Sequence, residues 1–496
     1  MLRRYSCQRS IYLAAIICVF LLKHAVFAQN GPVVELVKDI NRGREGSDPA
    51  GFVTLNGWAY FRANDGRRGF ELWRSNGTRD GTQLVVDLNA GPFNGFPDNI
   101  AVVNGSLYFT AFNDIRYQGS KVWRSDGTKS GTVLLADTYP ELRAGGPFGP
   151  PLPGQFTALN AYTVLFTALD REAGFELWKS DGTPGGTTRI IDLHSGQEWS
   201  IPIEFTPLRN VAYFAADDSA VYYPDGTATY NRELFRTDGT SLGTYRVKDI
   251  YPGPLPSTPT DFIRFRQRVF FRAQDRTHGT ELWSTNGTAA GTTLVSDLNP
   301  GPAGSNPQYP IEARIAGSEE SALVFLAEDG IHGQELFRSD GTAAGTRLIK
   351  DINPSGDSVP LGLTPYKGRV YFSADDGRHG DEIWVTDGTE AGTRLFADLN
   401  RGKLRSSPQS FTVAGGWLFF VAILPNDAQY TVQTQLWMTD GTAAGTRMIY
   451  QEPGMSYGYA INNLTALGNK LLFTAPNAVD AEGFSTDIEL FSVSLN

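Results

Sequence analysis

The chain has 496 residues, of which 19% are charged and 12% aromatic, and its formal net charge is −10. A hydrophobic fraction of 41% is enough for a large core, which excludes a disordered polyelectrolyte. The 54 glycines are too many for a coiled coil, and the acidic balance argues against a general nucleic-acid binder, which needs net positive charge.

The first 28 residues have the pattern of a secretory signal peptide. After a basic start, an apolar run extends from Ile11 to Leu22, which is short for a membrane span. The compact residues Val26 and Ala28 predict cleavage after Ala28, with an uncleaved anchor helix as the alternative. Cleavage removes Cys7 and Cys18, the only cysteines, and leaves no apolar stretch of membrane length. We therefore expect a secreted protein, located in the periplasm or on the cell surface if the source is a bacterium.

A repeat with the pattern [DN]GTxxGT runs through the remaining chain, and its copies begin 47 to 57 residues apart. We interpret each copy as a turn between two strands, in which the first side chain caps backbone N–H groups and glycine adopts a positive φ. A site repeated eight times is expected to be a folding device rather than a catalytic centre. The residues that open the turns are Asn76, Asp126, Asp181, Asp238, Asn286, Asp340, Asp387 and Asp440.

Each repeat is predicted to hold four antiparallel strands, because aromatic and β-branched residues alternate with small or polar ones. The pair Asn56-Gly57 is a hairpin signal between the first two strands of the first repeat. A unit of this length with four strands is typical of a β-propeller blade. The strands expected in the first repeat are Phe52–Gly57, Trp58–Asn64, Glu71–Asn76 and Gln83–Leu88.

The two ends of the chain are predicted to complete one blade together. Val33–Ile40 reads as a fourth strand without the first three, and the C-terminal segment reads as three strands without a fourth. Pairing them would close the ring and remove bare strand edges. The fold class is therefore an all-β single propeller over residues 29–496 with nine four-stranded blades; an eight-bladed ring with one irregular unit is the alternative.

The blocks that carry the repeat, such as ELWRSNGTRDGT and ELWKSDGTPGGT, resemble the bacterial ELWxxDGT repeat family over residues 33–493. Members of that family are typically exported, and most have no assigned activity. The resemblance therefore implies export and a repeat fold, and it implies no particular chemistry.

The predicted loops between the second and third strands supply the candidate binding residues. One position in five of these loops is an aspartate, and these candidates are Asp65, Asp170, Asp275, Asp329 and Asp376. A glutamate follows on the third strand, at Glu71, Glu176, Glu281, Glu335 and Glu382. These oxygen ligands could hold Ca²⁺, whereas turn-capping by the aspartates and a surface position for the glutamates is the alternative. No other cofactor is expected, since His278, His332 and His379 lie one per blade, too far apart for a zinc site.

Two further sets of residues have alternative interpretations. The sequons at Asn76, Asn104, Asn286 and Asn463 are candidate glycosylation sites in a eukaryote, although Asn76 and Asn286 also fit as substitutes for aspartate in the turn. The aromatic residue of each ELW block is expected to pack between blades, with a ring of sugar-stacking tryptophans as the alternative. These aromatic residues are Trp73, Trp123, Trp178, Phe235, Trp283, Phe337, Trp384, Trp437 and Phe491.

The longest insertions are predicted to lie on one face of the propeller, opposite the uniform DGTxxGT turns. They are Tyr139–Gly154, Asp217–Asn231, Leu424–Thr434 and Ala475–Asp487. A basic stripe in the fifth repeat (Arg264, Arg266, Arg268 and Arg272) could meet an anionic ligand or could be solvated or ion-paired.

Variable loops on a rigid scaffold usually build a binding site. We therefore expect a non-enzymatic binding or structural module for an extracellular glycan or protein partner. The alternative is a propeller glycosidase or lyase that acts on extracellular polysaccharide. The sequence contains no H-E-x-x-H motif, and cleavage at residue 28 would leave no cysteine nucleophile.

Overall fold

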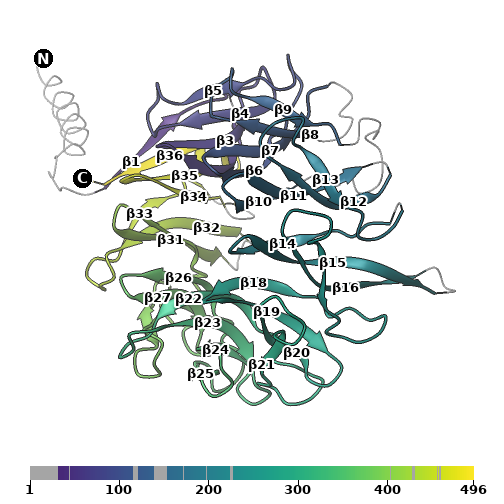
Figure 1. The fold of residues 1–496 in the computed structure, drawn as a ribbon. Coiled ribbons are helices and arrows are strands. Elements are labelled where there is room, and N and C mark those ends of the chain that lie inside the picture. Colours follow the sequence, from purple (N-terminus) through teal and green to yellow (C-terminus); the bar gives the residue numbers. More distant parts are fainter. Residues whose placement is uncertain are drawn as a thin grey trace, which may run out of the picture.

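The structure is a computed structural model that describes residues 32–495 apart from 44, 115–120, 139–153, 171, 197, 224–226, 403, 427–430, 455 and 457–459. The described residues form nine four-stranded antiparallel sheets arranged as the blades of one β-propeller (Figure 1). The predicted all-β fold with nine blades is therefore confirmed. Residues 1–28, predicted to be a signal peptide, and most of the segment 139–154 lie outside the described residues.

Blades 1 to 4 follow the chain in order, each with its strands in sequence order from the centre outward. They consist of β2 (Ala50–Leu55), β3 (Trp58–Asn64), β4 (Phe70–Ser75) and β5 (Gln83–Val86); β6 (Asp98–Val103), β7 (Ser106–Ala111), β8 (Lys121–Ser125) and β9 (Val133–Ala136); β10 (Gly154–Asn160), β11 (Thr163–Asp170), β12 (Gly174–Ser180) and β13 (Thr188–Ile191); and β14 (Ile203–Leu208), β15 (Val211–Tyr222), β16 (Ala228–Thr237) and β17 (Tyr245–Lys248).

Blades 5 to 8 repeat the same arrangement. They consist of β18 (Thr260–Phe265), β19 (Arg268–Asp275), β20 (Gly279–Thr285) and β21 (Thr293–Ser296); β22 (Gln308–Arg314), β23 (Ser321–Glu328), β24 (Gln334–Ser339) and β25 (Arg347–Lys350); β26 (Leu361–Tyr366), β27 (Arg369–Asp375), β28 (Asp381–Thr386) and β29 (Arg394–Ala397); and β30 (Gln409–Ala414), β31 (Trp417–Asn426), β32 (Thr431–Thr439) and β33 (Arg447–Gln451).

Blade 9 is shared between the two ends of the chain. It consists of β34 (Asn462–Leu467), β35 (Lys470–Val479), β36 (Ser485–Ser494) and the N-terminal strand β1 (Val33–Lys38). β1 pairs antiparallel with β36, and Val33 lies opposite Ser494 (Figure 1). The prediction that the N-terminal strand completes the last blade is thus confirmed.

The hydrophobic core lies between neighbouring blades, so both faces of each sheet are covered. At the closing junction, Trp73 and Phe61 of blade 1 pack with Leu472 and Leu490 of blade 9. All four side chains are at most 6% exposed. The aromatic residue of this ELW block therefore lies between blades, and the alternative of sugar stacking on it is ruled out by its burial.

The nine first strands line the centre of the propeller and contact one another around the whole ring. Each of them has an irregular register against the second strand of its blade, as between Ala50 and Val53 in blade 1. One residue in each irregularity has a positive φ, a conformation that costs free energy in residues other than glycine. These residues are Gly51, Asn99, Gln155, Glu204, Asp261, Tyr309, Gly362, Ser410 and Asn463.

Three predicted insertions are mainly longer strands. The segment 217–231 continues β15 and β16 into a hairpin that projects from the rim (Figure 1). The segments 424–434 and 475–487 likewise extend β31 with β32 and β35 with β36. Within the described residues, no helix is long and apolar enough to cross a membrane.

Candidate functional site

The DGTxxGT turns are closed by their own side chains. In the turn that begins at Asp181, the Oδ1 atom accepts hydrogen bonds from the N–H of Thr183 at 2.9 Å and from its hydroxyl at 2.7 Å. The Thr183 hydroxyl in turn accepts from the N–H of Gly186 at 3.1 Å. The same bonds recur in all eight turns, including those that open with Asn76 and Asn286. The turn residues therefore act within the backbone of their own hairpin.

The aspartates of the loops between second and third strands also bond locally. Asp275 Oδ1 accepts from the N–H groups of Thr277 and His278, and its Oδ2 lies 2.8 Å from His278 Nδ1. This bond raises the pKa of His278. The same pairing joins Asp329 to His332 and Asp376 to His379, and Arg68 takes the place of the histidine beside Asp65. The side chain of Asp170 lies outside the described residues.

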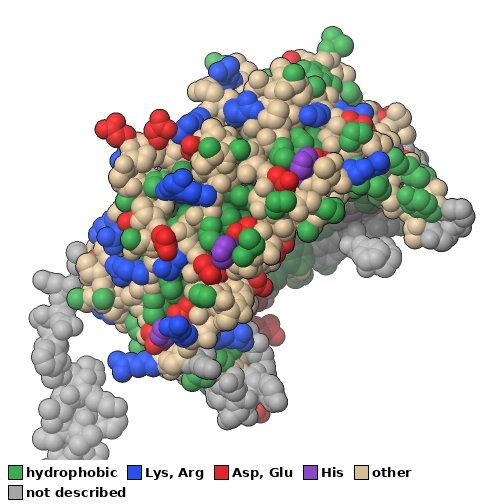
Figure 2. Space-filling view, turned by 90° about the horizontal axis from the view of Figure 1, so that it is seen from below, with side chains coloured by type: hydrophobic (Ala, Val, Ile, Leu, Met, Phe, Trp, Pro, Cys, Tyr) green, Lys and Arg blue, Asp and Glu red, His purple; other side chains and the backbone are tan. Residues whose placement is uncertain are grey.

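Acidic and histidine side chains accordingly lie next to one another on the surface (Figure 2). Within the part of the chain that the structure describes, no group of three or more metal-ligating side chains comes together. Four of the five aspartates have described side chains, and each of these caps its own turn: Asp65, Asp275, Asp329 and Asp376.

The glutamates of the third strands are buried, so the expectation of a surface position was wrong. Glu71 is 0% exposed, and its carboxylate accepts from the N–H of Leu88 at 2.7 Å and from that of Gly95 at 2.8 Å. It thereby fixes the loop that leads to the next blade. Burial raises the pKa of Glu71 to about 7, against the lowering effect of these hydrogen bonds. The same buried position is occupied by Glu176, Glu233, Glu281, Glu335, Glu382 and Glu489.

The arginine stripe of blade 5 is largely paired. Arg266 forms an ion pair with Glu320, and Arg272 Nε lies 3.0 Å from Asp261 Oδ2. Arg268 donates to the hydroxyl of Ser284 at 3.1 Å. These bonds favour the ion-paired interpretation of the stripe over an anion-binding site.

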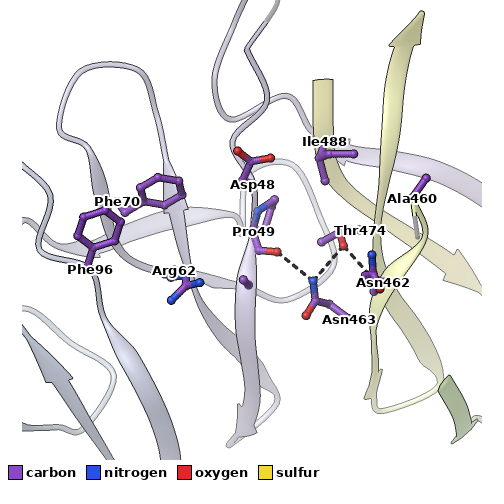
Figure 3. Close-up of a pocket in the computed structure, with 11 residues that line it drawn as sticks. Asp48, Pro49, Arg62, Phe70, Phe96, Ala460, Asn462, Asn463, Thr474 and Ile488 are labelled. Atoms are coloured by element: carbon purple, nitrogen blue, oxygen red, sulfur yellow. Dashed lines mark hydrogen bonds between the residues drawn. The ribbon is translucent and has the colours of Figure 1, made fainter. Parts of the chain in front are cut away.

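A pocket that sequence reasoning missed lies where the ring closes, between the end of blade 9 and the start of blade 2. It has a volume of about 380 Å³ and is lined by Asp48, Pro49, Ala50, Arg62, Phe70, Phe96, Ala460, Asn462, Asn463, Thr474 and Ile488. Figure 3 shows the two phenylalanine rings and Arg62 on one side, the asparagines and Thr474 on the other, and Asp48 between them. We call it the closure pocket.

The aromatic side of the closure pocket is a stacked pair. The rings of Phe70 and Phe96 lie 5.3 Å apart between centroids at 18°. The N–H of Phe96 donates to the carbonyl of Phe70 at 3.0 Å, which fixes the loop against the strand. Phe96 is 38% exposed, so this pair offers an apolar surface to a ligand.

The closure pocket carries opposite charges. Arg62 Nη1 lies 3.3 Å from Asp98 Oδ1, so the two side chains form an ion pair. Partial burial and the neighbouring Asp487 carboxylate raise the pKa of Asp48. Because two carboxylates lie close together, this end of the pocket favours a cation.

The polar side of the pocket is held by hydrogen bonds across the closing junction. Asn463 Nδ2 donates to the carbonyl of Pro49 at 3.2 Å and to the hydroxyl of Thr474 at 3.1 Å. Blade 9 is thus tied to the strand that opens blade 1 (Figure 3). No sequence pattern predicts this site, because its residues come from both ends of the chain.

The sequence contains two G-x-S-x-G patterns, which sequence reasoning also missed. Gly239–Gly243 is part of a DGTxxGT turn, and Gly454–Gly458 lies outside the repeated turns. In serine hydrolases such a serine stands on a sharp turn between a strand and a helix, beside a histidine base. Here Ser456 lies between two strands, and its N–H and C=O pair with Val432. The described histidines lie in other blades than Ser456. His194 is in the loop that follows blade 3, and His278, His332 and His379 belong to blades 5, 6 and 7. Gly454–Gly458 therefore does not form a nucleophile elbow.

Comparisons with known proteins give similarity in structure alone. No family model matches the chain, and no curated protein matches its sequence. Three similar solved structures are a puromycin hydrolase, prolyl oligopeptidase B from Galerina marginata and the β-propeller domain of the Trilobed protease from Pyrococcus furiosus. For these the sequence identity is 15, 9 and 9% and the TM-score 0.39, 0.39 and 0.36. The matches cover 78, 88 and 81% of this chain, and 59, 61 and 96% of the other chains.

These structures contradict two predictions. The chain was expected to be a non-enzymatic binding or structural module for an extracellular glycan or protein, and not to be an enzyme, whereas the similar structures come from peptidases. Both predictions were wrong. At such low identity the likeness concerns the propeller fold alone, so the activity of those peptidases does not pass to this chain.

Proposed function

We propose that the chain takes up a short peptide in the closure pocket. The observation that carries this proposal is the combination of Arg62, Asp48 and the Phe70–Phe96 pair in one cavity of about 380 Å³. A short peptide has a carboxylate for the guanidinium, an ammonium group for Asp48 and an apolar side chain for the phenylalanine rings. The volume lies in the range of sites for small ligands.

The charges of the pocket support a zwitterionic ligand over a neutral one. The ion pair with Asp98 engages Nη1 of Arg62, so a ligand carboxylate would be bound by the other N–H groups of the guanidinium. Burial and, to a smaller extent, the neighbouring Asp487 carboxylate raise the pKa of Asp48, and a ligand cation beside Asp48 would offset both effects. A neutral sugar would satisfy neither charge.

Titration calorimetry with Ala-Ala-Phe and with its C-terminal amide tests the proposal. We expect the free acid to bind about 10- to 100-fold more tightly, since a hydrogen bond to a charged group is worth about 1.5–3 kcal/mol. Arg62→Gln should abolish this preference. Arg67→Gln is the matched control, because Arg67 is exposed on the neighbouring loop.

Equal affinity for the free acid and the amide would refute the proposal. So would an Arg67→Gln variant that loses the preference for the free acid to the same extent as Arg62→Gln. Mass spectrometry of the same samples reports whether the peptide is cleaved.

We further propose that the chain is an exported member of the ELWxxDGT repeat family. The basic start, the short apolar run and the compact residues before position 29 support removal of residues 1–28, and the eight repeated turns support the family. The peptide ligand would then come from an extracellular protein. N-terminal sequencing of the secreted protein tests the cleavage site.

A further inference from the structure

A second cavity lies beside the hairpin that projects from blade 4. It has a volume of about 330 Å³ and is lined by Glu198, Trp199, Ile201, Asp217 and Tyr230. We call it the hairpin pocket. Its residues come from the loop that leads into blade 4 and from the long strands β15 and β16, so the hairpin has a use that the repeat itself does not explain.

Two of the residues that line the hairpin pocket are exposed aromatic side chains. Trp199 is 43% exposed and Tyr230 is 43% exposed. Tyr222, at the end of β15, is 59% exposed and bonds to Glu198 of the pocket. Exposed aromatic surface gathered at one cavity is a feature of interaction sites.

The aromatic wall is held in place before any ligand arrives. The ring of Trp199 lies 5.9 Å from that of Phe175 between centroids. The next residue, Ser200, donates its N–H to Glu176 and its hydroxyl to the carbonyl of Phe175. The N–H of Asp217 donates to the carbonyl of Ser200 at 2.8 Å, which ties the hairpin to the loop. A ligand therefore meets a wall that is already ordered.

The two carboxylates of the hairpin pocket, Asp217 and Glu198, differ in whether a positive charge lies beside them. Asp217 accepts two hydrogen bonds from Arg232, at 3.0 and 2.8 Å, so its charge is neutralised. Glu198 forms no ion pair with any residue that the structure describes. It accepts a hydrogen bond from the hydroxyl of Tyr222, which raises the pKa of that phenol to about 12. Glu198 thus brings a negative charge into an aromatic cavity.

We propose that the hairpin pocket binds the basic side chain, lysine or arginine, of a peptide. A cation is attracted both to the faces of tryptophan and tyrosine rings and to a carboxylate beside them. A neutral sugar would stack on the rings but would offer Glu198 no positive charge. The proposal rests on the proposed function in taking a peptide as the ligand.

The test compares Ala-Lys-Ala-Ala-Phe with the same peptide in which norleucine replaces lysine. We expect the lysine peptide to bind about tenfold more tightly at low salt, and the ratio to approach one in Glu198→Gln. Glu319→Gln is the matched control, because Glu319 is exposed on the turn that joins the first two strands of blade 6. Thermal melts of all variants check that the fold is kept.

The design separates the two proposals. Arg62 lies in the closure pocket, three blades away from the hairpin pocket, so Arg62→Gln should leave the binding of both peptides at the hairpin pocket, and the ratio between them, unchanged. Glu198→Gln should change this ratio and leave the preference of the closure pocket for the free acid unchanged. A ratio near one in the unmodified protein, or an unchanged ratio in Glu198→Gln, would overturn the hairpin-pocket proposal. An uncharged oligosaccharide could also displace the lysine peptide. If it bound the unmodified protein and Glu198→Gln with equal affinity, the pocket would be assigned to a sugar and the proposal would be overturned.

Discussion

The carboxylate of Glu489 accepts a hydrogen bond from the N–H of Ile40 at 3.1 Å, although 449 residues separate them in the chain. It also accepts from the N–H and the hydroxyl of Ser47, at 3.0 and 2.7 Å. In blade 1, Glu71 accepts from the N–H groups of Leu88 and Gly95 in the same manner. The closing junction is therefore built with the same contact that joins consecutive blades.

Glu489→Ala should lower the free energy of unfolding by about 3 kcal/mol or more. The substitution leaves three buried donors without an acceptor, and each such group costs about 1–3 kcal/mol. Glu35→Ala, on the exposed side of β1, should change stability by less than about 0.5 kcal/mol. Denaturant titration of both variants measures the difference, and similar effects would show that Glu489 does not hold the junction.

Gly186→Ala should be far more damaging than Gly185→Ala, although the two glycines are adjacent. A Cβ atom at residue 186 would lie 2.1 Å from the carboxylate of Asp181, whereas a Cβ at residue 185 meets nothing within 4 Å. The first change displaces the capping aspartate and should cost about 1–3 kcal/mol, and the second should be nearly neutral. Thermal melts of the two variants provide the comparison; equal melting temperatures would mean that the turn does not depend on Asp181.

Stability should be highest at mildly acidic pH and should fall towards pH 8. Burial raises the pKa of Glu71, Glu176, Glu233, Glu382 and Glu489 to about 7. A carboxyl group whose pKa is higher in the folded chain binds more protons when folded. Its contribution is thus complete below the unfolded value of 4.5 and is lost as the pH rises through about 7.

The turn aspartates act in the opposite direction at low pH. Hydrogen bonds from the turn threonines lower the pKa of Asp126, Asp181 and Asp440 below 3.8, so their contribution is lost as the pH falls through that lowered value. Melting temperatures at constant ionic strength should therefore peak between about pH 4 and 6. A melting temperature that rises steadily to pH 8 would contradict the raised pKa values of the buried carboxyl groups.

Secretion from a eukaryotic host should give folded protein with glycans on Asn76 and Asn286 but not on Asn463. Asn76 and Asn286 are exposed, and their turn bonds use Oδ1, which leaves Nδ2 for the sugar. Asn463 Nδ2 instead donates to Pro49 and Thr474 within the closure pocket. Peptide mass spectrometry after enzymatic deglycosylation locates the glycans, and an occupied Asn463 in folded protein would contradict the assigned contacts.

The propeller was predictable because its signal is repeated. Eight DGTxxGT turns mark the same point in each blade, and the turn is closed by side chains within a few residues of one another. The incomplete strand sets at the two ends then indicate the ninth blade. Local contacts that recur at a regular spacing can be recognised in a single sequence.

The buried glutamates were misplaced for a physical reason. Glu71 was assigned to the surface because an isolated carboxylate is costly to bury. Its partners are the backbone N–H groups of Leu88 and Gly95, which any residue would provide. No side-chain pattern announces such partners, so the sequence could not show that the charge is compensated.

The two pockets could not be found because they depend on departures from the repeat. The closure pocket joins Asp48 to Asn463, and the hairpin pocket joins Glu198 to Tyr230 in the lengthened hairpin of blade 4. The register irregularity of the first strand has the same backbone conformation in every blade, but the residue with the positive φ differs in type, for example Gly51 in blade 1 and Tyr309 in blade 6. Both proposed binding sites therefore lie in features that differ between blades.

Because β1 pairs with β36, the last blade cannot be completed until nearly the whole chain has been synthesised. β1 is among the first segments to be made and its partner among the last, so the N-terminal strand remains without its neighbour until almost the whole chain has been translated. At about 5–20 residues per second this takes roughly half a minute to a minute and a half. Throughout that interval a nascent chain carries an exposed strand edge at each end of the growing arc of blades. A factor that covers such edges should therefore raise the yield of folded protein without binding the finished ring.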